Sequence, residues 1–541
     1  MDTLAITTFL AFTILVLLLS FWITRNDNLA SSEGYFLAGR SLGAWVIAGS
    51  LILTNLSTEH LIGLNGDAFN HTVAVMAWET TAALAMVLTA VYFLPRYLKL
   101  GLTTIPEFLA LRFDTQTRVF ASTIFLFSYV AAILPIVLLF GATGLESLFD
   151  LSEATGWTRK ETLSATVWVV GVLGATYAVI GGLKTVAIAD TINGVGFLVA
   201  GLLIPYLALS MLGDGNAIAG FKEVFEAEHE KFDITGDEPG SFLPFGVLFT
   251  GMIINQVFFW CTNQSIVQRA LAAKNLKEGQ KGVLIAAVFK LIGPLIIVLP
   301  GVIAYHMFKD QITPENYLLA YPTLVKTVLP SPMIGFFAAV MVGAVLSTFN
   351  SVLNSSATLF SQGIYHTCIN KHATDRQLVR AGRTCSIVLA LGAMTVAPFV
   401  DTSGSLYAYL QKINATFFGP MLAVILLGML TTRVSALAAK AALVLGPCLF
   451  YLLVFVGGDT LQNILKASFG LADGLHFLHM LAIVFTLTVI LMLTISHCRP
   501  ATNVFKFEAS GAVDLTPWRW TSTAATAICV ATVMVYIALA Q

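Results

Sequence analysis

Long apolar runs recur along almost the whole chain, and they restrict it to folds that cross a lipid bilayer. A helix needs about 20 mostly apolar residues to cross the hydrocarbon core. By that criterion the sequence predicts about fourteen membrane-spanning helices, at residues 4–23, 44–68, 73–95, 118–144, 163–182, 186–211, 244–267, 281–307, 333–363, 380–400, 404–431, 434–456, 475–496 and 520–540.

Composition supports the membrane assignment and excludes several other classes of protein. Charged residues make up 11% of the chain, whereas soluble domains carry about 25%. The net charge of −1 gives no sign of a nucleic-acid partner. The six cysteines form no C-x-x-C pair, and no nucleotide-binding G-x-x-x-x-G-K-[ST] loop occurs. The sequence therefore predicts neither a structural zinc site, nor direct ATP drive, nor an enzyme.

Basic residues in the predicted loops indicate how the chain is oriented. If the amino terminus lies outside, twenty of the 29 Lys and Arg residues fall in cytoplasmic loops, seven in outer loops and two within spans. An excess of Lys and Arg marks the cytoplasmic side. We therefore expect both termini outside, and we expect a small surface helix in the acidic outer loop 212–243.

Polar residues interrupt two of the predicted spans. The first interruption, at residues 54–60, reads Thr-Asn-Leu-Ser-Thr-Glu-His, and the second, at 255–263, begins Asn-Gln and ends Thr-Asn. The two spans lie five apart, and matched interruptions of this kind indicate an inverted-repeat transporter. Unwound backbone there can offer carbonyl oxygens to a cation. The alternative is a pair of ordinary polar kinks.

A stripe of hydroxyl groups lies on the predicted span 333–363. Ser347, Ser351 and Ser355 recur every four residues, so they share one helical face with Thr348 beside them. Neutral hydroxyl oxygens suit a small hard cation. The alternative is that each hydroxyl bonds back to the carbonyl four residues earlier.

Ionisable residues inside the spans are few. They are Glu59, Glu79, Asp190 and Lys290, with Lys412 near a span end. Each costs about 2.5–3.5 kcal/mol at a helix centre, so such residues mark pathways or paired sites. Glu79 and Lys290 would suit a hydroxyl-rich solute, with amides such as Gln256 and Gln411 assisting. The alternative is a purely structural ion pair.

Five motifs show a family resemblance that extends over nearly the whole chain. They are Tyr35-Phe-Leu-Ala-Gly-Arg-Ser-Leu42, Thr104-Ile-Pro-Glu-Phe108 with Arg112-Phe113, Gly181-Gly-Leu183, Val267-Gln-Arg-Ala-Leu-Ala-Ala-Lys274 and Asn354-Ser-Ser-Ala-Thr-Leu-Phe360. The chain resembles the sodium/solute symporter family, specifically its bacterial sodium/galactose and animal sodium/glucose branch.

The resemblance implies an all-α, LeuT-like fold of five plus five helices in inverted repeat. One transmembrane transporter domain would span 1–541, with repeats at 44–211 and 244–431 and peripheral helices at 1–43 and 432–541. The plasma membrane, and specifically the bacterial inner membrane, is the expected location. Sodium is the coupling ion, and no other cofactor is expected.

The resemblance also implies site residues. Sodium would bind the carbonyls of Leu53, Leu56 and Ala344 and the hydroxyls of Ser347 and Thr348. Solute contacts fall on Asn55, His60, Glu79, Ala82, Gln256, Lys290, Ser351 and Gln411, and gating aromatics on Phe259, Trp260 and Tyr407. A second sodium would use Asp190, although Asn350 replaces one of the expected hydroxyls.

Four positions depart from the galactose pattern. His60 replaces a Gln, Ala82 a Ser, Gln256 an Asn and Phe259 a Tyr. The sequence therefore predicts sodium-coupled symport of a sugar or polyol by alternating access, without specifying galactose. Two alternatives stay open: symport of an acidic sugar or other organic anion, and a sensor that binds sugar without transporting it.

The predicted orientation can be tested with reporter fusions. Alkaline phosphatase fused after residue 541 should be active because it would lie outside, whereas a fusion in the basic loop at 371–376 should be inactive. Enzyme activity normalised to protein level gives the answer. The reverse pattern would contradict the assignment.

Overall fold

The structure is a computed structural model that describes residues 3–235, 242–400, 405–458, 461, 463, 466, 475–501 and 505–539. Residues 404 and 540, at the ends of two predicted spans, and part of the acidic outer loop lie outside the described residues. The described residues are nearly all helical, with only isolated β-bridges such as the one between Leu42 and Ala273.

The helices of the first half have the following bounds: α1 Thr3–Thr24, α2 Ser32–Leu37, η1 Ala38–Arg40, α3 Ala44–Asn55, η2 Glu59–Leu64, α4 Asn65–Asn70, η3 Val73–Met76, α5 Ala77–Leu88, η4 Thr89–Phe93, α6 Leu94–Leu100, α7 Ile105–Arg112, α8 Thr115–Ser128, η5 Tyr129–Ile133, α9 Leu134–Phe149, α10 Leu151–Thr155, α11 Arg159–Leu212, α12 Ala217–Ala227 and η6 His229–Phe232.

The second half continues in the same way: η7 Phe245–Phe249, α13 Gly251–Cys261, α14 Gln264–Leu271, α15 Leu276–Ile292, α16 Pro294–Ile297, α17 Leu299–Phe308, η8 Pro314–Leu319, α18 Ala320–Val328, α19 Ser331–Thr358, η9 Leu359–Ile369, α20 Asp375–Val396, η10 Ala397–Phe399, α21 Leu406–Leu430, α22 Ala436–Tyr451, η11 Leu452–Val456, α24 Phe477–Cys498 and α25 Thr521–Leu539.

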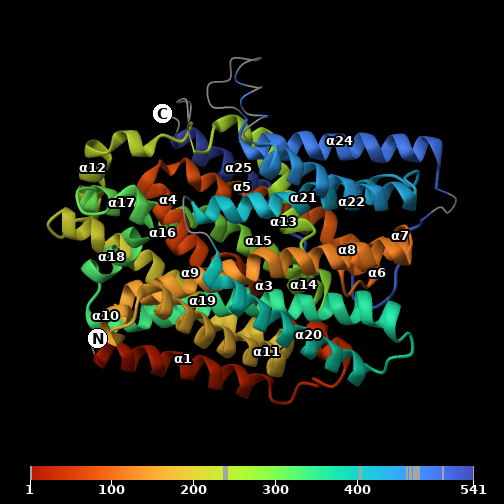
Figure 1. The fold of residues 1–541 in the computed structure, drawn as a ribbon, viewed down its shortest axis with the longest axis horizontal. Coiled ribbons are helices and arrows are strands. Elements are labelled where there is room, and N and C mark those ends of the chain that lie inside the picture. The colour runs from red at the N-terminus through yellow and green to blue at the C-terminus, as the bar shows by residue number, and fades with distance from the viewer. Residues whose placement is uncertain are drawn as a thin grey trace.

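The helices form one bundle around a buried centre. In Figure 1, α1, α11 and α19 pack along one side and α21, α22 and α24 along the other, with α3, α13 and α15 between them. Large apolar side chains such as Trp45, Val169 and Phe249 are exposed on the outside. This distribution suits a protein whose surroundings are lipid rather than water.

Ten helices in the described part of the chain are long and apolar enough to cross a membrane, or eleven if the bent pair α15 and α16–α17 counts as one span. The predicted count of fourteen is therefore not confirmed. Two expected spans are split into helices too short for the criterion, and two others run together in the 54-residue α11.

Gly182 divides α11 between its two predicted spans. Its backbone has φ 62° and ψ −171°, a region that only glycine adopts readily. A Cβ atom at this position would lie 3.0 Å from the Tyr35 carbonyl oxygen. The glycine therefore allows both the bend and the close approach of the α2 segment.

Both interrupted spans are confirmed as broken helices. In the first, α3 ends at Asn55 and helical backbone resumes at Glu59. In the second, Thr262 and Asn263 separate α13 from α14. The Asn263 side chain accepts a hydrogen bond from the Ser265 N–H at 3.1 Å, which caps the new helix. The acidic loop at 212–243 also contains the expected surface helix, α12.

Replacing Gly182 with Ala should destabilise the protein by about 1–3 kcal/mol, because alanine is strained at this backbone conformation. A lower melting temperature in detergent would measure the loss. Gly392→Ala on α20 is the matched control, since its Cβ would meet no atom within 4 Å. Equal melting temperatures for the two variants would contradict the role assigned to Gly182.

Candidate functional site

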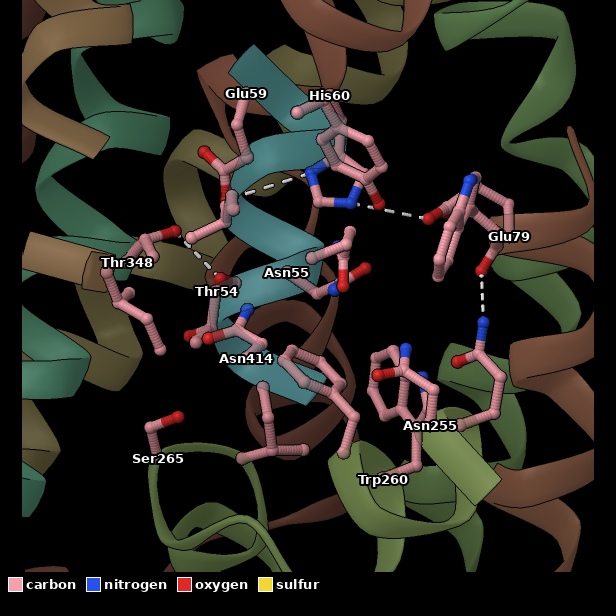
Figure 2. Close-up of a pocket in the computed structure, with 18 of the residues that line it drawn as sticks. Thr54, Asn55, Glu59, His60, Glu79, Asn255, Trp260, Ser265, Thr348 and Asn414 are labelled. Atoms are coloured by element: carbon pink, nitrogen blue, oxygen red, sulfur yellow. Dashed lines mark hydrogen bonds and ion pairs between the residues drawn. The ribbon is translucent and has the colours of Figure 1, made fainter. Parts of the chain in front are cut away.

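A cavity of about 60 Å³ lies where the two broken spans meet. Its walls come from α3, η2, α5, η5, α13, α14, α19 and α21, and Figure 2 shows many of the side chains pointing inward. The lining residues are Thr54, Asn55, Glu59, His60, Trp78, Glu79, Ile133, Asn255, Gln256, Phe259, Trp260, Ser265, Ile266, Thr348, Val352, Tyr407, Leu410, Gln411 and Asn414.

A charge cluster occupies one end of this cavity. The Lys290 ammonium lies 2.5 Å from Glu79 Oε2 and also donates to Asn55 Oδ1. His60 lies between two carboxylates, with Nε2 3.5 Å from Glu79 Oε1 and Nδ1 3.7 Å from Glu59 Oε1. All of these side chains are buried. Buried charges of this kind persist only when they are paired.

Aromatic rings form the walls next to the charges. Lys290 Nζ lies 5.1 Å from the centre of the Trp260 ring, and the Phe259 ring packs edge-on against Trp260. Tyr407 lies 5.3 Å from His60 and 5.9 Å from Trp78, measured between ring centres. The cavity therefore combines flat apolar surfaces with a few fixed polar groups, as small-molecule sites do.

The break in the first span leaves backbone carbonyls without their helical partners. Ser57 N–H donates to the Asn55 carbonyl at 2.9 Å, and His60 N–H donates to the Ser57 carbonyl at 3.0 Å. In a continuous α-helix these two donors would serve the carbonyls of Leu53 and Leu56. These are the two carbonyls expected in the sodium site.

The hydroxyl stripe of α19 lies against this break. Thr348 Oγ1 donates to the Thr54 carbonyl at 2.7 Å, and Ser347 Oγ lies 3.5 Å from Thr54 Oγ1. Ala344, one turn earlier on α19, is buried. The structure thus brings the predicted hydroxyls next to the unwound backbone, at the edge of the cavity (Figure 2).

Next to the cavity-lining Ser265, a fully buried arginine joins three helices. Arg269 of α14 donates to the Ser265 carbonyl, to Ser351 Oγ and, at 3.2 Å, to Ser50 Oγ. Ser50 in turn donates to Asp190 at 2.6 Å. The polar groups of α3, α11, α14 and α19 are therefore linked in one network.

Asp190 also lines a second cavity, of about 30 Å³. Ser347, Asn193 and Asn350 lie in the same wall. Asn350 Oδ1 is buried and has no hydrogen-bond partner in the described part of the chain. The second predicted ion site therefore has oxygen atoms around it, although Asn350 supplies an amide where a hydroxyl was expected.

Most predicted solute and gate residues do line the main cavity: Asn55, His60, Glu79, Gln256, Phe259, Trp260, Tyr407 and Gln411. Lys290 and Ser351 do not line it. Lys290 instead contacts Glu79 and Asn55, and Ser351 is held by Arg269 and by Thr54 Oγ1 at 3.0 Å. Ala82 is buried outside the lining.

Several cavity residues were not predicted from the sequence as site residues, among them Glu59, Trp78, Asn255 and Asn414. Two features of the sequence could have indicated Asn255 and Asn414. Asn255 precedes Gln256 in the second interruption, and Asn414 follows Gln411 by three residues, which places both on one face of α21.

Two broken helices around a polar cavity, within a multi-pass helical membrane protein, are typical of secondary transporters. The family model described as "Sodium:solute symporter family" matches residues 35–446. The chain belongs to the sodium:solute symporter family. As a member of this family it is a sodium-coupled symporter and not an enzyme.

Two curated relatives are similar over most of the chain. One is the "Uncharacterized symporter YidK" of Escherichia coli, 43% identical over 100% of this chain and 92% of the relative. Another is the "Sodium/glucose cotransporter" of Vibrio parahaemolyticus, 30% identical over 77% of this chain and 79% of the relative.

Solved structures show the same fold. A Na⁺-coupled sialic acid symporter matches with a TM-score of 0.77 at 20% identity, covering 93% of this chain and 99% of its own. Mhp1, a nucleobase-cation-symport-1 family transporter, matches with a TM-score of 0.53 at 15% identity, covering 88% and 96%. The LeuT-like fold is therefore confirmed.

A double-mutant comparison separates a structural ion pair from a solute site. Lys290→Met alone leaves the Glu79 carboxylate unpaired and should destabilise the protein by about 3–5 kcal/mol. The double variant Glu79→Gln with Lys290→Met should melt close to wild type yet lack uptake. Melting temperature and proteoliposome uptake are the two measurements. Normal uptake by the stable double variant would reduce the pair to a structural role.

Proposed function

We propose that this symporter carries a neutral sugar or polyol together with sodium by alternating access. The observation that carries the proposal is the Lys290–Glu79–Asn55 group: Glu79 and Asn55 line an aromatic-walled cavity beside an unwound helix, and Lys290 bonds to both of them. His60, Gln256 and Gln411 extend the same polar surface.

The chemistry of this group suits hydroxyls. A sugar hydroxyl both donates and accepts, so it can bond to a carboxylate and to an amide at once. The rings of Trp260, Tyr407 and Phe259 offer apolar surface to the C–H face of a sugar ring. Relatives named as sodium/glucose and sodium/myo-inositol cotransporters support this substrate class.

In this proposal, sodium binds between the carbonyls of Leu53, Leu56 and Ala344 and the hydroxyls of Ser347 and Thr348. Such a cation would replace the missing helical donors of the break and hold α3 against α19. Sodium binding from outside would then order the adjoining solute cavity. Sodium release to the cytoplasm would loosen the contact and let the inner half open.

The energy available from one sodium ion is sufficient. One charge crossing 100 mV supplies about 2.3 kcal/mol. A tenfold sodium gradient adds about 1.4 kcal/mol. Together they would support roughly several-hundred-fold accumulation of a neutral solute. A second ion at Asp190 would raise this limit.

Thr348→Ala should raise the sodium concentration needed for half-maximal uptake about fivefold to tenfold, because one oxygen ligand is lost. Sodium-dependent uptake into proteoliposomes measures the effect. Ser356→Ala is the matched control, since the Ser356 hydroxyl donates only to the Val352 carbonyl of its own helix, at 2.8 Å.

Two outcomes of this assay would change the proposal. Unchanged sodium dependence in Thr348→Ala would remove the sodium-site assignment. Solute binding without any sodium-driven uptake by the wild type would instead favour a sensor.

A further inference from the structure

A third cavity, of about 360 Å³, lies between α9, the start of α11, η8 and η10. This volume falls in the range of small-molecule sites. The cavity shares no lining residue with the two cavities described above. The neighbouring helices α10 and α18 lie at the left end of the bundle in Figure 1, beside the N terminus. The distribution of basic residues predicts that this end is outside.

Charged side chains of both signs line this cavity. Arg159 and Lys160 come from the first turn of α11, and Glu315 comes from η8. None of the three side chains forms an ion pair or a hydrogen bond with another residue in the described part of the chain. The Lys160 ammonium lies 5.8 Å from the centre of the Phe399 ring. Opposite charges that share a cavity without pairing with each other suit a ligand that carries both signs.

A buried hydroxyl in the same wall also has no partner. Thr143 of α9 is 5% exposed and lines the cavity, and its hydroxyl forms no hydrogen bond with any residue that the structure describes. Threonines in membrane helices often bond back to the carbonyl four residues earlier. Thr166 does so, to Thr162 at 2.8 Å. Buried polar groups without a partner are rare, so the Thr143 hydroxyl points to an acceptor on a bound ligand.

The remaining surroundings of the cavity are largely apolar. Leu139, Leu163 and Leu319 contribute to its walls. Next to it, the side chains of Phe399 and Trp157 are 77% and 53% exposed. Exposed aromatic side chains at the end of a membrane-spanning helix mark the level of the lipid headgroups. The cavity therefore lies where a lipid can place its headgroup and the upper part of its acyl chains.

We propose that this cavity binds one phospholipid with an ethanolamine headgroup. The phosphodiester pairs with Arg159 and Lys160, since a guanidinium can donate two parallel hydrogen bonds to a phosphate. The ammonium of the headgroup donates to Glu315, and the Thr143 hydroxyl donates to a phosphate or ester oxygen. The acyl chains lie against the leucines.

The headgroup chemistry predicts a preference among lipids. A choline headgroup has no N–H group, so it offers Glu315 no hydrogen bond. An anionic glycerol headgroup has no ammonium, so it leaves the Glu315 carboxylate without an ion pair. The site involves none of the residues assigned to solute or sodium, so it does not depend on the proposed function.

Native mass spectrometry of the full-length protein tests this preference. The protein in detergent is offered equal amounts of phosphatidylethanolamine, phosphatidylcholine and phosphatidylglycerol with identical acyl chains. It should retain one phosphatidylethanolamine about threefold to fivefold more often than either other lipid. Equal retention of the three lipids, or a preference for one of the other two, would overturn the proposal.

Charge-removing variants assign the contacts. Glu315→Gln should make the retention of the ethanolamine and choline lipids equal. Arg159→Gln combined with Lys160→Gln should lower the retention of both lipids about fivefold. Glu226→Gln and Lys222→Gln are the matched controls, because these exposed residues of α12 pair with each other at 3.6 Å and do not line the cavity. Wild-type selectivity in Glu315→Gln, or wild-type retention in the basic double variant, would contradict the assigned contacts.

The soluble headgroup distinguishes a lipid from a small polar ligand. Glycerophosphoethanolamine at a hundredfold excess should not displace the retained lipid, because it lacks acyl chains. Its displacement of the lipid would overturn the lipid assignment. The three charged side chains are exposed, so their variants should fold. A variant that does not is recognised by its melting temperature, and the lipid selectivity of the wild type then decides the proposal.

Discussion

The interruption of the first broken span is the constraint on which the rest of the structure depends. Between Asn55 and Glu59 the helical hydrogen-bond pattern stops, so carbonyl oxygens lie in the middle of a membrane protein without their usual donors. Such backbone would be intolerable against lipid. The surrounding helices therefore have to enclose it, and the polar stripe of α19 supplies the surface that does so.

Because the surrounding helices enclose the break, the predicted sodium-binding groups and the charge cluster both lie at the main cavity. On one side of the cavity, Thr348 donates a hydrogen bond to the backbone of α3. On the other side, Lys290 is paired with Glu79 and also donates to Asn55. Asn55 is the last residue of α3, so it joins the charge cluster directly to the end of the unwound helix. A change in how α3 meets α19 would consequently move one of the groups that position Lys290.

The sequence predicted the fold class and both broken helices because their signals are local: apolar length, and polar residues inside an apolar run. It singled out Glu79 and Lys290 as candidate site residues because intramembrane charges are rare, and the structure shows them buried and paired. The number of spans was less accessible, since a glycine bend at Gly182 and short half-helices do not fit a simple length rule. Asn255 and Asn414 were not assigned as site residues because an amide inside a helix gives no sign of whether its partners are protein or ligand. Only the three-dimensional packing reveals that their oxygens are unpaired.

The buried guanidinium of Arg269 has a consequence for how the protein can move. It bonds to hydroxyls on α3 and α19 from its position on α14, and Ser50 connects it onward to Asp190. Separating such a charge from its partners inside low-dielectric surroundings would be expensive. The segments around Arg269 should therefore stay joined when the contact between Thr54 of α3 and Thr348 of α19 loosens, so that they shift as one rigid block while bending is concentrated at the unwound joints. Such a block would resist slippage, in which one cargo crosses without the other.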